Sequence, residues 1–507
     1  MASTLDELGP TEYNNRRIGP GQIGPAQRSD TQVLQEAESL KIRDYSRLIA
    51  ELSQTYSEHA PKSARAHDRA KRSLVDGGSH ALRLMQPFPP SIVSAQGAWL
   101  TDEDGHRILD FWQGHFANIL GHNPPVVASA IADALENGYG LQTGFEDRLQ
   151  VEAAEILCQQ TGSERVRFTT SGTLATMYAV QLSCAFTGRE TVMKVGAGWH
   201  GAQPWGLKGV SYHPDAERAF QHVESNGLPP AVTDAVVVTR FNDAERLKDD
   251  FRRHGDRLAC FIVEPLLGAG GGLPATREFL HTARELTQRY GALLIFDEVI
   301  AGFRFRAGDV GTLYELRPDL ATFGKAIGGG MPVAAVGGRE DVMRLVGRGG
   351  GSKVSFSGGT YSSHPASMLA AKIYMEYLVA HEDEVYPRLA DLGTMARATV
   401  EAAFAEQGIY ARCTGPDRVE EMLPGGSLSE VVFPYEECQD LRSPEDLRDP
   451  EVCDVALSER VLPLALLTLD VHSYQGLGAL STAHTKEDIE LLGEASRRAA
   501  QLVKKHQ

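Results

Sequence analysis

Short, continuously apolar runs alternate with longer segments of helical spacing over most of the chain. The runs lie in ETVMKVG, AVVVTRF, ACFIVEP, GALLIFDEV and VAAVGG. Because they are apolar at nearly every position rather than at every second one, they are typical of strands buried on both faces of a parallel sheet. The alternation of such strands with helices predicts an α/β fold, in which helices flank a mostly parallel sheet.

The chain of 507 residues is long enough for more than one domain. We expect residues 154–374, which hold these runs, to form a large domain. Residues 76–153, with the turn-linked strand pattern AQGAWLTDEDGHRILDF, and residues 375–507 are expected to combine in a smaller α+β domain. Residues 1–75 form an N-terminal extension that is partly helical, since Arg43–Glu58 has helical spacing. That helix could pack on a dimer or bind a partner, and the sequence leaves both open.

The most informative chemistry follows the run GALLIF. Asp297 comes directly after it, and ligands of open α/β sheets lie beyond the carboxyl ends of the strands. An aspartate there is also commonly just a helix N-cap. Lys325 follows in the glycine-rich stretch TFGKAIGGGMP, where the backbone can approach a ligand closely. A lysine amine forms a Schiff base with a carbonyl cofactor, and pyridoxal 5'-phosphate (PLP) also needs a carboxylate at its ring nitrogen, so this pair indicates PLP.

Three ordered blocks, FDEVIAGFR, TFGKAIGGGMP and GGTYSSHP, resemble the signature blocks of class III (subgroup II) PLP-dependent aminotransferases. The likeness runs from about Gly77 to about Glu490, and it is similar to the branch of glutamate-1-semialdehyde 2,1-aminomutase and the related β- and ω-amino acid transaminases. It implies the PLP-dependent transferase fold of type I. It also implies that Lys325 anchors the cofactor as an internal aldimine and that Asp297 pairs with its ring nitrogen.

A third segment suggests where the cofactor phosphate binds. Ser171, Gly172 and Thr173 open a helical pattern after RVRFTT. Hydroxyls and free N–H groups at a helix N-terminus form an anion site, although Ser-Gly-Thr is also an ordinary turn and cap. Their position in the family pattern implies a phosphate site. The resemblance further implies that Thr360 reaches the phosphate of a neighbouring subunit, in a homodimer with shared active sites.

The segment after VMKVGAG carries the residues expected to surround the cofactor ring. Trp199 and His200 stand where the family has an aromatic-His-Gly block. The indole offers a flat face for the pyridine ring, although a core tryptophan would also fit this pattern. The resemblance implies that Val299 packs on the opposite ring face. It also implies that Glu264, in the strand-end pair Glu-Pro, supports the network of Asp297.

The substrate residues follow from a second comparison within the family. In GGSHALR, Arg83 lines up with the arginine that binds the substrate carboxylate in the aminomutase branch. A guanidinium binds a carboxylate bidentately, but a surface arginine is the plain alternative. His80 replaces a serine of that block, and His115 stands where the branch has tryptophan. Ala269 stands where transaminases of the ornithine and 4-aminobutyrate type have a gating glutamate.

These departures favour a PLP-dependent aminotransferase that moves an amino group between a β- or ω-amino acid, or an amino aldehyde, and an oxo acceptor. Glutamate-1-semialdehyde 2,1-aminomutase, which transfers the group within one molecule, is the alternative and uses the same residues. An alternative of another class is a catalytically degenerate homologue that acts as a binding partner. The sequence leaves the donor, the acceptor and the pathway open.

The resemblance implies small amino and oxo substrates as partners, and composition disfavours other classes of partner. The formal net charge of −17 disfavours nucleic acid and anionic membranes. The most apolar stretch, VLPLALLTL, is too short to span a bilayer, and no N-terminal signal pattern is seen, so we expect a cytoplasmic protein. The six cysteines form no CxxC pair, and the histidines are scattered, so no metal site is expected.

Overall fold

The computed structural model describes residues 43–214, 219–349, 353–416, 423, 425–474 and 476–506, and the following account concerns these residues. The segment Arg43–Gln507 forms one compact unit. Most of the extension predicted for residues 1–75 lies outside the described residues. Its last part forms two helices, described below.

Seven strands form the central sheet, in the order β4 (Arg165–Thr169), β12 (Ala334–Gly338), β11 (Leu320–Phe323), β10 (Leu293–Glu298), β7 (Leu258–Val263), β5 (Thr191–Val195) and β6 (Val236–Thr239). Only β12 runs antiparallel to its neighbours. The prediction of a mostly parallel sheet is confirmed, and each apolar run of the sequence is one of these strands.

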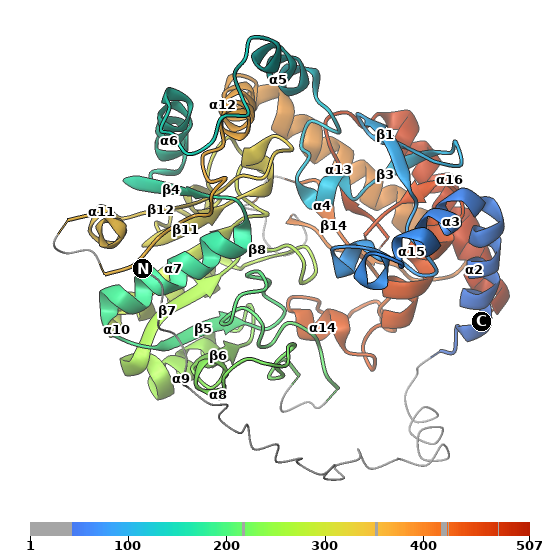
Figure 1. Cartoon of the computed structure of the whole chain (residues 1–507). Helices are drawn as coiled ribbons and strands as arrows, with labels where there is room; N and C mark the ends of the chain where they lie inside the picture. The colour runs from blue at the N-terminus through green and yellow to red at the C-terminus, as the bar shows by residue number, and fades with distance from the viewer. Residues whose placement is uncertain are drawn as a thin grey trace, which may run out of the picture. The chain divides into compact units, whose positions relative to one another are not determined.

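Helices on both faces of the sheet explain why the strands are apolar throughout. The main covering helices are α7 (Gly172–Thr187), α9 (Ala244–His254) and α10 (Arg277–Tyr290). In β7, Cys260 and Ile262 pack on the α7 side, whereas Phe261 and Val263 pack on the side of α9 and α10. Because side chains alternate along a strand, a strand with helices on both faces needs apolar residues at every position. Figure 1 shows α7 lying across the strands.

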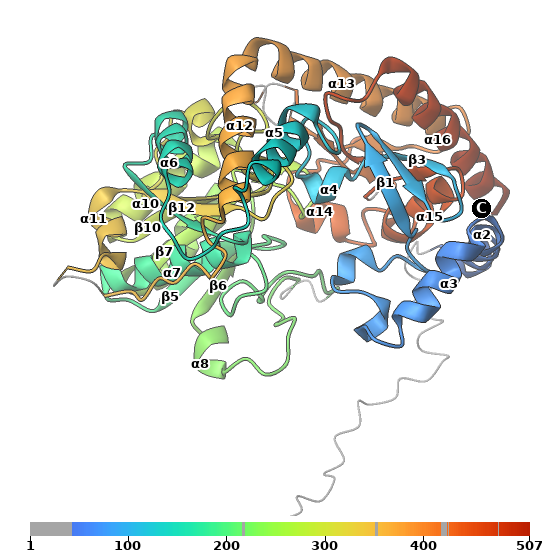
Figure 2. The same ribbon diagram turned by 45° about the horizontal axis from the view of Figure 1, so that its top comes forward.

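A second, four-stranded sheet joins segments from opposite ends of the chain. Its strands are β1 (Ile92–Gln96), β2 (Trp99–Asp102), β3 (Arg107–Asp110) and β16 (Val471–His472), and β16 pairs with β3 in parallel. Figure 2 shows this sheet beside α15 (Leu462–Leu467) and α16 (Lys486–His506). Strands from 76–153 and from 375–507 therefore share one sheet. The assignment of these segments to a separate small domain stays a prediction.

The helix expected at Arg43–Glu58 forms as α2 (Ser46–His59). It buries Leu48, Leu52 and Tyr56 in the same core as residues of α15 and α16. Its apolar face is therefore covered within the chain. The next helix, α3 (Pro61–Ala70), buries only Ser63.

The remaining elements are short strands and connecting helices. Among the described residues, none of the helices combines the length and apolarity needed to cross a bilayer. The further elements are α4 (Gln113–Phe116), α5 (Pro125–Glu136), α6 (Arg148–Thr161), α8 (Pro230–Thr233), β8 (Leu266–Leu267), β9 (Leu273–Pro274), α11 (Glu340–Met343), α12 (Pro365–Ala380), α13 (Glu382–Ala405), β13 (Arg412–Cys413), β14 (Leu428–Ser429), β15 (Val431–Val432), α14 (Pro444–Arg448) and β17 (Gly478–Ala479).

The parallel strands end at one edge of the central sheet, and three charged residues lie at or just after the ends of those strands. Asp297 lies near the end of β10, Glu264 follows β7, and Lys325 follows β11. The register places Asp297 opposite Thr322 of β11. Because ligands of open α/β sheets bind beyond this edge, the fold brings the predicted residues to the expected place.

We predict that Tyr374→Phe destabilises the fold. The buried Tyr374 hydroxyl, on α12, accepts hydrogen bonds from the backbone N–H groups of Ile119 and Leu120, both at 3.0 Å. Losing the acceptor leaves one buried and one partly buried donor unpaired, which reduces the free energy of unfolding by about 1–3 kcal/mol. Urea denaturation should show a lower midpoint. Tyr361→Phe is the control, since Tyr361 is 62% exposed, and equal midpoints for the two variants would contradict this account.

Candidate active site

Lys325 lies in a strained turn directly after β11. Its φ of +45° is in the left-handed region, which side chains other than glycine rarely adopt. Such a conformation costs about 1–3 kcal/mol and is found mainly at functional sites. The half-buried side chain lines a cavity of about 490 Å³. Burial lowers the pKa of Lys325 to about 8, although the carboxylates of Asp297 and Glu264 act in the opposite direction.

Asp297 is held in one orientation by three hydrogen bonds. Its Oδ2 lies 2.7 Å from His200 Nδ1, and its Oδ1 accepts from Thr322 Oγ1 at 2.9 Å and from the backbone N–H of Val299 at 3.2 Å. The side chain is 3% exposed. Leu293 and Ile295 of the same strand pack on the α7 side, so the period of two puts Asp297 on that side as well.

His200 is buried, and the pair with Asp297 uses only one of its ring nitrogens. Because a carboxylate accepts hydrogen bonds, His200 donates from Nδ1. Its Nε2 has no partner among the described residues. Burial lowers the pKa of His200 against the effect of Asp297. Thr176 Oγ1 donates to the His200 carbonyl at 2.6 Å, which ties this segment to α7.

Glu264 connects the sheet edge to the segment that carries Trp199. Its Oε1 accepts from the backbone N–H of Trp199 at 2.9 Å, and its Oε2 accepts from Gly268 at 3.0 Å. Burial, together with the nearby charge of Asp297, raises the pKa of Glu264 to about 8. The two hydrogen bonds of Glu264 hold the backbone of Trp199 and Gly268 beside the cavity.

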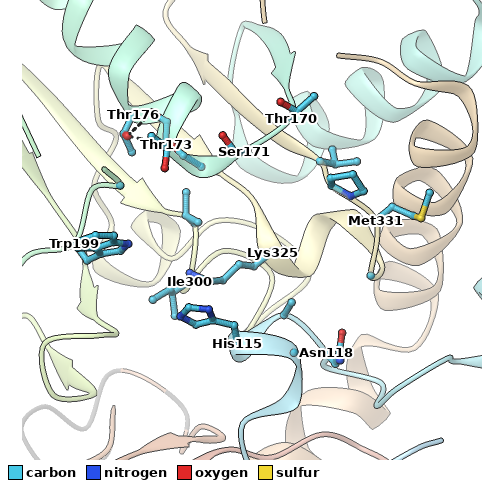
Figure 3. A pocket seen from close by; sticks show the side chains of 18 of the residues that line it. His115, Asn118, Thr170, Ser171, Thr173, Thr176, Trp199, Ile300, Lys325 and Met331 are labelled. Carbon is cyan, nitrogen blue, oxygen red and sulfur yellow. Dashed lines mark hydrogen bonds between the residues drawn. The ribbon is translucent and has the colours of Figure 1, made fainter. Parts of the chain in front are cut away.

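The N-terminus of α7 faces the cavity, and two glycines allow its neighbours to approach. Ser171 caps the helix, with its Oγ accepting from the N–H of Leu174 at 3.3 Å. A Cβ on Gly172 would lie 2.9 Å from Val299 Cγ1. A Cβ on Gly201, whose φ is +80°, would lie 2.5 Å from Thr173 Oγ1. Figure 3 shows Ser171 and Thr173 at the end of this helix, with Lys325 facing them.

The structure brings together nearly all the residues predicted to bind the cofactor. Those that line the cavity are Ser171, Gly172, Thr173, Trp199, His200, Glu264, Asp297, Val299 and Lys325. Thr360 does not line it and is exposed. In this single chain, Thr360 lies next to Gly359, at which a Cβ would lie 3.6 Å from Thr170 Oγ1.

His80 and His115 form the wall on the other side of Lys325. Their ring centroids lie 5.2 Å apart, edge to face. Burial, with Lys325 as the next cause, lowers the pKa of His115 to about 3, and burial also lowers the pKa of His80. Both imidazoles are therefore neutral near pH 7. His80 Nδ1 is buried and has no hydrogen-bond partner in the described part of the chain.

His115 belongs to a left-handed turn, α4, in which Gln113, Gly114, His115 and Phe116 all have positive φ. Left-handed helical geometry costs roughly 1–2 kcal/mol for each residue other than glycine. Buried hydrogen bonds hold both ends of this turn. Asp110 accepts from the N–H of Gln113 at 2.9 Å, and Arg304 donates to the carbonyl of Phe116. These contacts keep the His115 ring beside Lys325, as Figure 3 shows.

Arg83 stands apart from the other predicted substrate residues. It is exposed at the end of a short 3-10 turn and lines neither the cavity around Lys325 nor the adjoining one. It is nevertheless close enough for its charge to lower the pKa values of His80 and His115, after the larger effect of burial.

Sequence reasoning missed the residues that hold the site in shape. Thr322 precedes Lys325 in a run that predicts only a strand. Its hydrogen bond to Asp297 depends on the register of β10 and β11, which the sequence does not show. Arg304 is a fully buried arginine after GF, with no spacing signal. Asp110 also pairs with His122 Nε2 at 2.7 Å and with His472 Nδ1 at 2.8 Å, and His472 comes from a distant part of the chain.

Comparisons with known proteins agree on one family. The family model Aminotransferase class-III matches residues 83–410. Among curated proteins, the glutamate-1-semialdehyde 2,1-aminomutase of Thermomicrobium roseum is 35% identical over 447 residues, which cover 85% of this chain and 96% of that protein.

Solved structures with the same fold include transaminases of several kinds. An ω-transaminase from Sphaerobacter thermophilus is 32% identical, with a TM-score of 0.77, and the match covers 87% of this chain and 97% of that one. A β-phenylalanine aminotransferase from Variovorax paradoxus is 31% identical, with a TM-score of 0.76, over 90% and 97%. A transaminase solved with PLP bound is 31% identical, with a TM-score of 0.75, over 88% and 99%.

The residues at the cavity fit the cofactor of this family. PLP needs a lysine amine, a carboxylate for its ring nitrogen and an anion site for its phosphate. Lys325, the oriented Asp297 and the N-terminus of α7 supply these groups around one cavity. Hydrogen bonds from His200 and Thr322 orient the Asp297 carboxylate, which suits it to pair with a protonated ring nitrogen.

We predict that the amine of Lys325 becomes reactive near pH 8 in the cofactor-free protein. Because burial lowers its pKa from 10.5 to about 8, the free amine dominates from slightly alkaline pH upward. Only the free amine is nucleophilic. Labelling with acetic anhydride at a series of pH values, followed by peptide mass spectrometry, should give a Lys325 midpoint near pH 8. The exposed Lys353 is the reference in the same samples, and a Lys325 midpoint near 10.5 would contradict this account.

Proposed function

The chain belongs to the class III aminotransferases, which depend on PLP, and we propose that it transfers an amino group from a β- or ω-amino acid, or a related amine, to an oxo acceptor. The observation that carries this proposal is the position of Lys325 between two cavities. One holds Asp297 and the α7 N-terminus, and the other, of about 590 Å³, is largely apolar. The second gives room for a substrate larger than a short polar aldehyde.

In the proposed site, bound PLP supplies an electron sink for a carbanion at the substrate carbon. Asp297 keeps the ring nitrogen protonated, because its carboxylate is held toward the cavity by His200 and Thr322. Ser171 and Thr173, with the backbone N–H groups of the α7 N-terminus, hold the phosphate. Trp199 and Val299 pack on the ring faces, and Glu264 fixes the Trp199 backbone.

Lys325 holds the cofactor covalently and, once a substrate amine releases it, moves a proton at the substrate carbon. A pKa of about 8 suits this role, since the amine then exchanges a proton readily near neutral pH. The strained turn keeps the amine within the cavity while its attachment changes. The β11 strand, which is buried throughout, provides the rigid base for this turn.

We propose that His80, His115 and Arg83 receive the substrate carboxylate. Neutral imidazoles donate hydrogen bonds, and the buried His80 Nδ1 lacks a partner among the described residues. Arg83, exposed near the two histidines, adds positive charge at the entrance. A carboxylate between these groups would be oriented by hydrogen bonds from the two imidazoles and by the charge of Arg83.

We further propose a homodimer in which Thr360 reaches the partner's cofactor phosphate. Thr360 is exposed, and so are three large apolar residues near it in sequence or space. Leu141 is 74% exposed, Phe145 78% and Tyr361 62%. The N–H of Ala366, which follows this segment, donates to the carbonyl of Gly140 at 3.2 Å, so the two stretches are neighbours. Exposed large apolar residues on two neighbouring stretches are consistent with an interaction surface.

The second candidate function is intramolecular amino transfer in glutamate 1-semialdehyde. The similarity to the curated aminomutase of Thermomicrobium roseum favours it. Its reaction would use the same lysine and aspartate. The two candidates differ in the fate of the amino group, because an aminomutase returns it to the same molecule and releases an isomer, whereas a transaminase releases a product that has lost it.

We predict that an absorbance scan separates the two candidates. The purified protein with PLP should show a visible band, which β- or ω-amino acids convert to the amino form of the cofactor with release of an oxo acid. This result would support the transaminase. Isomerisation of glutamate 1-semialdehyde to a product that keeps the amino group, with no conversion of the band by the other amino acids, would establish the aminomutase and overturn our proposal.

We predict that Lys325→Ala abolishes turnover, with a loss of at least about 1,000-fold, because no other group replaces its proton transfer. The variant should still bind PLP non-covalently, which fluorescence titration can measure. Lys353→Ala, which removes an exposed lysine, is the matched control and should keep full activity. Substantial residual turnover in the Lys325 variant would refute the assigned role.

A further inference from the structure

Lys194 of β5 is a fully buried lysine that lines neither cavity. Val192, two positions earlier, packs on the α7 side of the sheet, so the period of two puts Lys194 on the side where Asp297 also lies. A charged group that is 0% exposed is costly unless its donors are satisfied. The contacts of its amine therefore indicate why a lysine stands at this position.

Three backbone carbonyl oxygens of the segment that follows β5 surround the amine of Lys194. Its Nζ donates to the carbonyls of Gly198 at 2.7 Å, of Lys208 at 2.9 Å and of Gly206 at 3.2 Å. Three acceptors use all three donors of an ammonium group, whereas a neutral amine has only two. The ammonium therefore gathers the segment 198–208 around one point.

The peptide group between Gly198 and Trp199 is held at both ends. Lys194 binds its carbonyl oxygen at 2.7 Å, and Glu264 Oε1 accepts from its N–H at 2.9 Å. Since a peptide group is planar and stiff, contacts at its opposite ends fix its orientation. That orientation sets the direction in which the chain continues to Trp199 and His200.

His200 lies close to the same segment and is sensitive to the charge of Lys194. A Cβ on Gly198 would lie 3.0 Å from His200 Nε2, so the ring has little room for another position. Burial lowers the pKa of His200, and the charge of Lys194 lowers it further, against the effect of Asp297. Lys194 thus favours the neutral imidazole that donates to Asp297 at 2.7 Å.

We propose that Lys194 is a positioning residue for amino transfer, which holds the peptide group before Trp199 so that the indole and the His200–Asp297 pair meet the cofactor ring. This role rests on the proposed function, in which Trp199 packs on the ring and Asp297 pairs with its nitrogen. Lys194 itself touches neither cofactor nor substrate, and no bond of the reaction changes there. A lysine that only stabilised the fold would leave the placement of these groups unchanged.

Proton NMR of histidine N–H groups tests this role without any cofactor. In the cofactor-free full chain, the His200 N–H that binds Asp297 should give a downfield signal, identified by its loss in His200→Gln. We expect Lys194→Met, which removes the charge and all three donors, to shift or remove this signal. A pH of about 6 keeps the ammonium form in the majority, because burial lowers the pKa of Lys194 to about 7 against the charges of Glu264 and Glu224.

Reference signals separate positioning from a general loss of structure. His122 and His472 both pair with Asp110 far from Lys194 in sequence, and their N–H signals should stay in Lys194→Met. If that variant does not fold, Lys194→Gln, which keeps a neutral donor, takes its place. An unchanged His200 signal, or its loss only together with the reference signals in both variants, would overturn the proposal.

Lys208→Met is the matched control for losing a buried amine contact. Lys208 Nζ also donates to backbone carbonyls, of Val236 at 2.8 Å and of Thr233 at 3.1 Å, but it does not hold the Gly198 peptide group. This variant should keep the His200 signal. Its loss in Lys208→Met as well would contradict a specific role of Lys194.

Titration with PLP at the same pH gives a second readout. We expect Lys194→Met to raise the Kd for PLP about tenfold, and Lys208→Met to change it by less than about twofold. In a protein that carries Trp199→Ala and His200→Ala, Lys194→Met should change the Kd by less than about twofold, because the groups through which it acts are gone. A rise of about tenfold in both backgrounds, or in neither, would refute the positioning role.

Failure of this inference is distinguishable from failure of the proposed function. A visible cofactor band in the parent protein, with equal PLP binding by the parent and Lys194→Met, would refute only the role of Lys194. Absence of PLP binding by the parent protein would refute the proposed function. The His200 signal would still decide in that case whether Lys194 places the imidazole.

Discussion

The pairing of Asp297 with His200 and Thr322 is the constraint on which the rest of the site depends. A carboxylate that is 3% exposed is costly unless it is hydrogen-bonded. The sheet register supplies Thr322, and the segment after β5 supplies His200 at 2.7 Å. The pair is therefore a product of the fold rather than of local sequence. It aims one negative charge at a cavity whose opposite side carries the amine of Lys325.

Two strained segments of the chain lie at the candidate site. Lys325 has a positive φ, and so do all four residues of the turn that carries His115. Asp110 and Arg304 hold that turn with buried hydrogen bonds. Strain of this kind persists only where the surroundings determine it, and it keeps side chains from relaxing away from a ligand. The two cavities meet at this point, so in our proposal it lies between the cofactor and the larger part of the substrate.

Sequence alone predicts the sheet and its apolar strands, because strands buried under helices on both faces are apolar at nearly every position. It also predicts the Lys325 and Asp297 pair, since glycines and a strand end leave local signals. It does not predict Asp110, whose partner His472 comes from a distant segment. Nor does it reveal that Arg83 is exposed. Such facts depend on tertiary packing, which no spacing encodes.

The most direct test of the central claim is to map the lysine that holds the cofactor. The purified protein is loaded with PLP, reduced with borohydride, digested and analysed by peptide mass spectrometry. Our account predicts that the retained cofactor is on the peptide that contains Lys325. Modification of a different lysine, or none after loading, would contradict it.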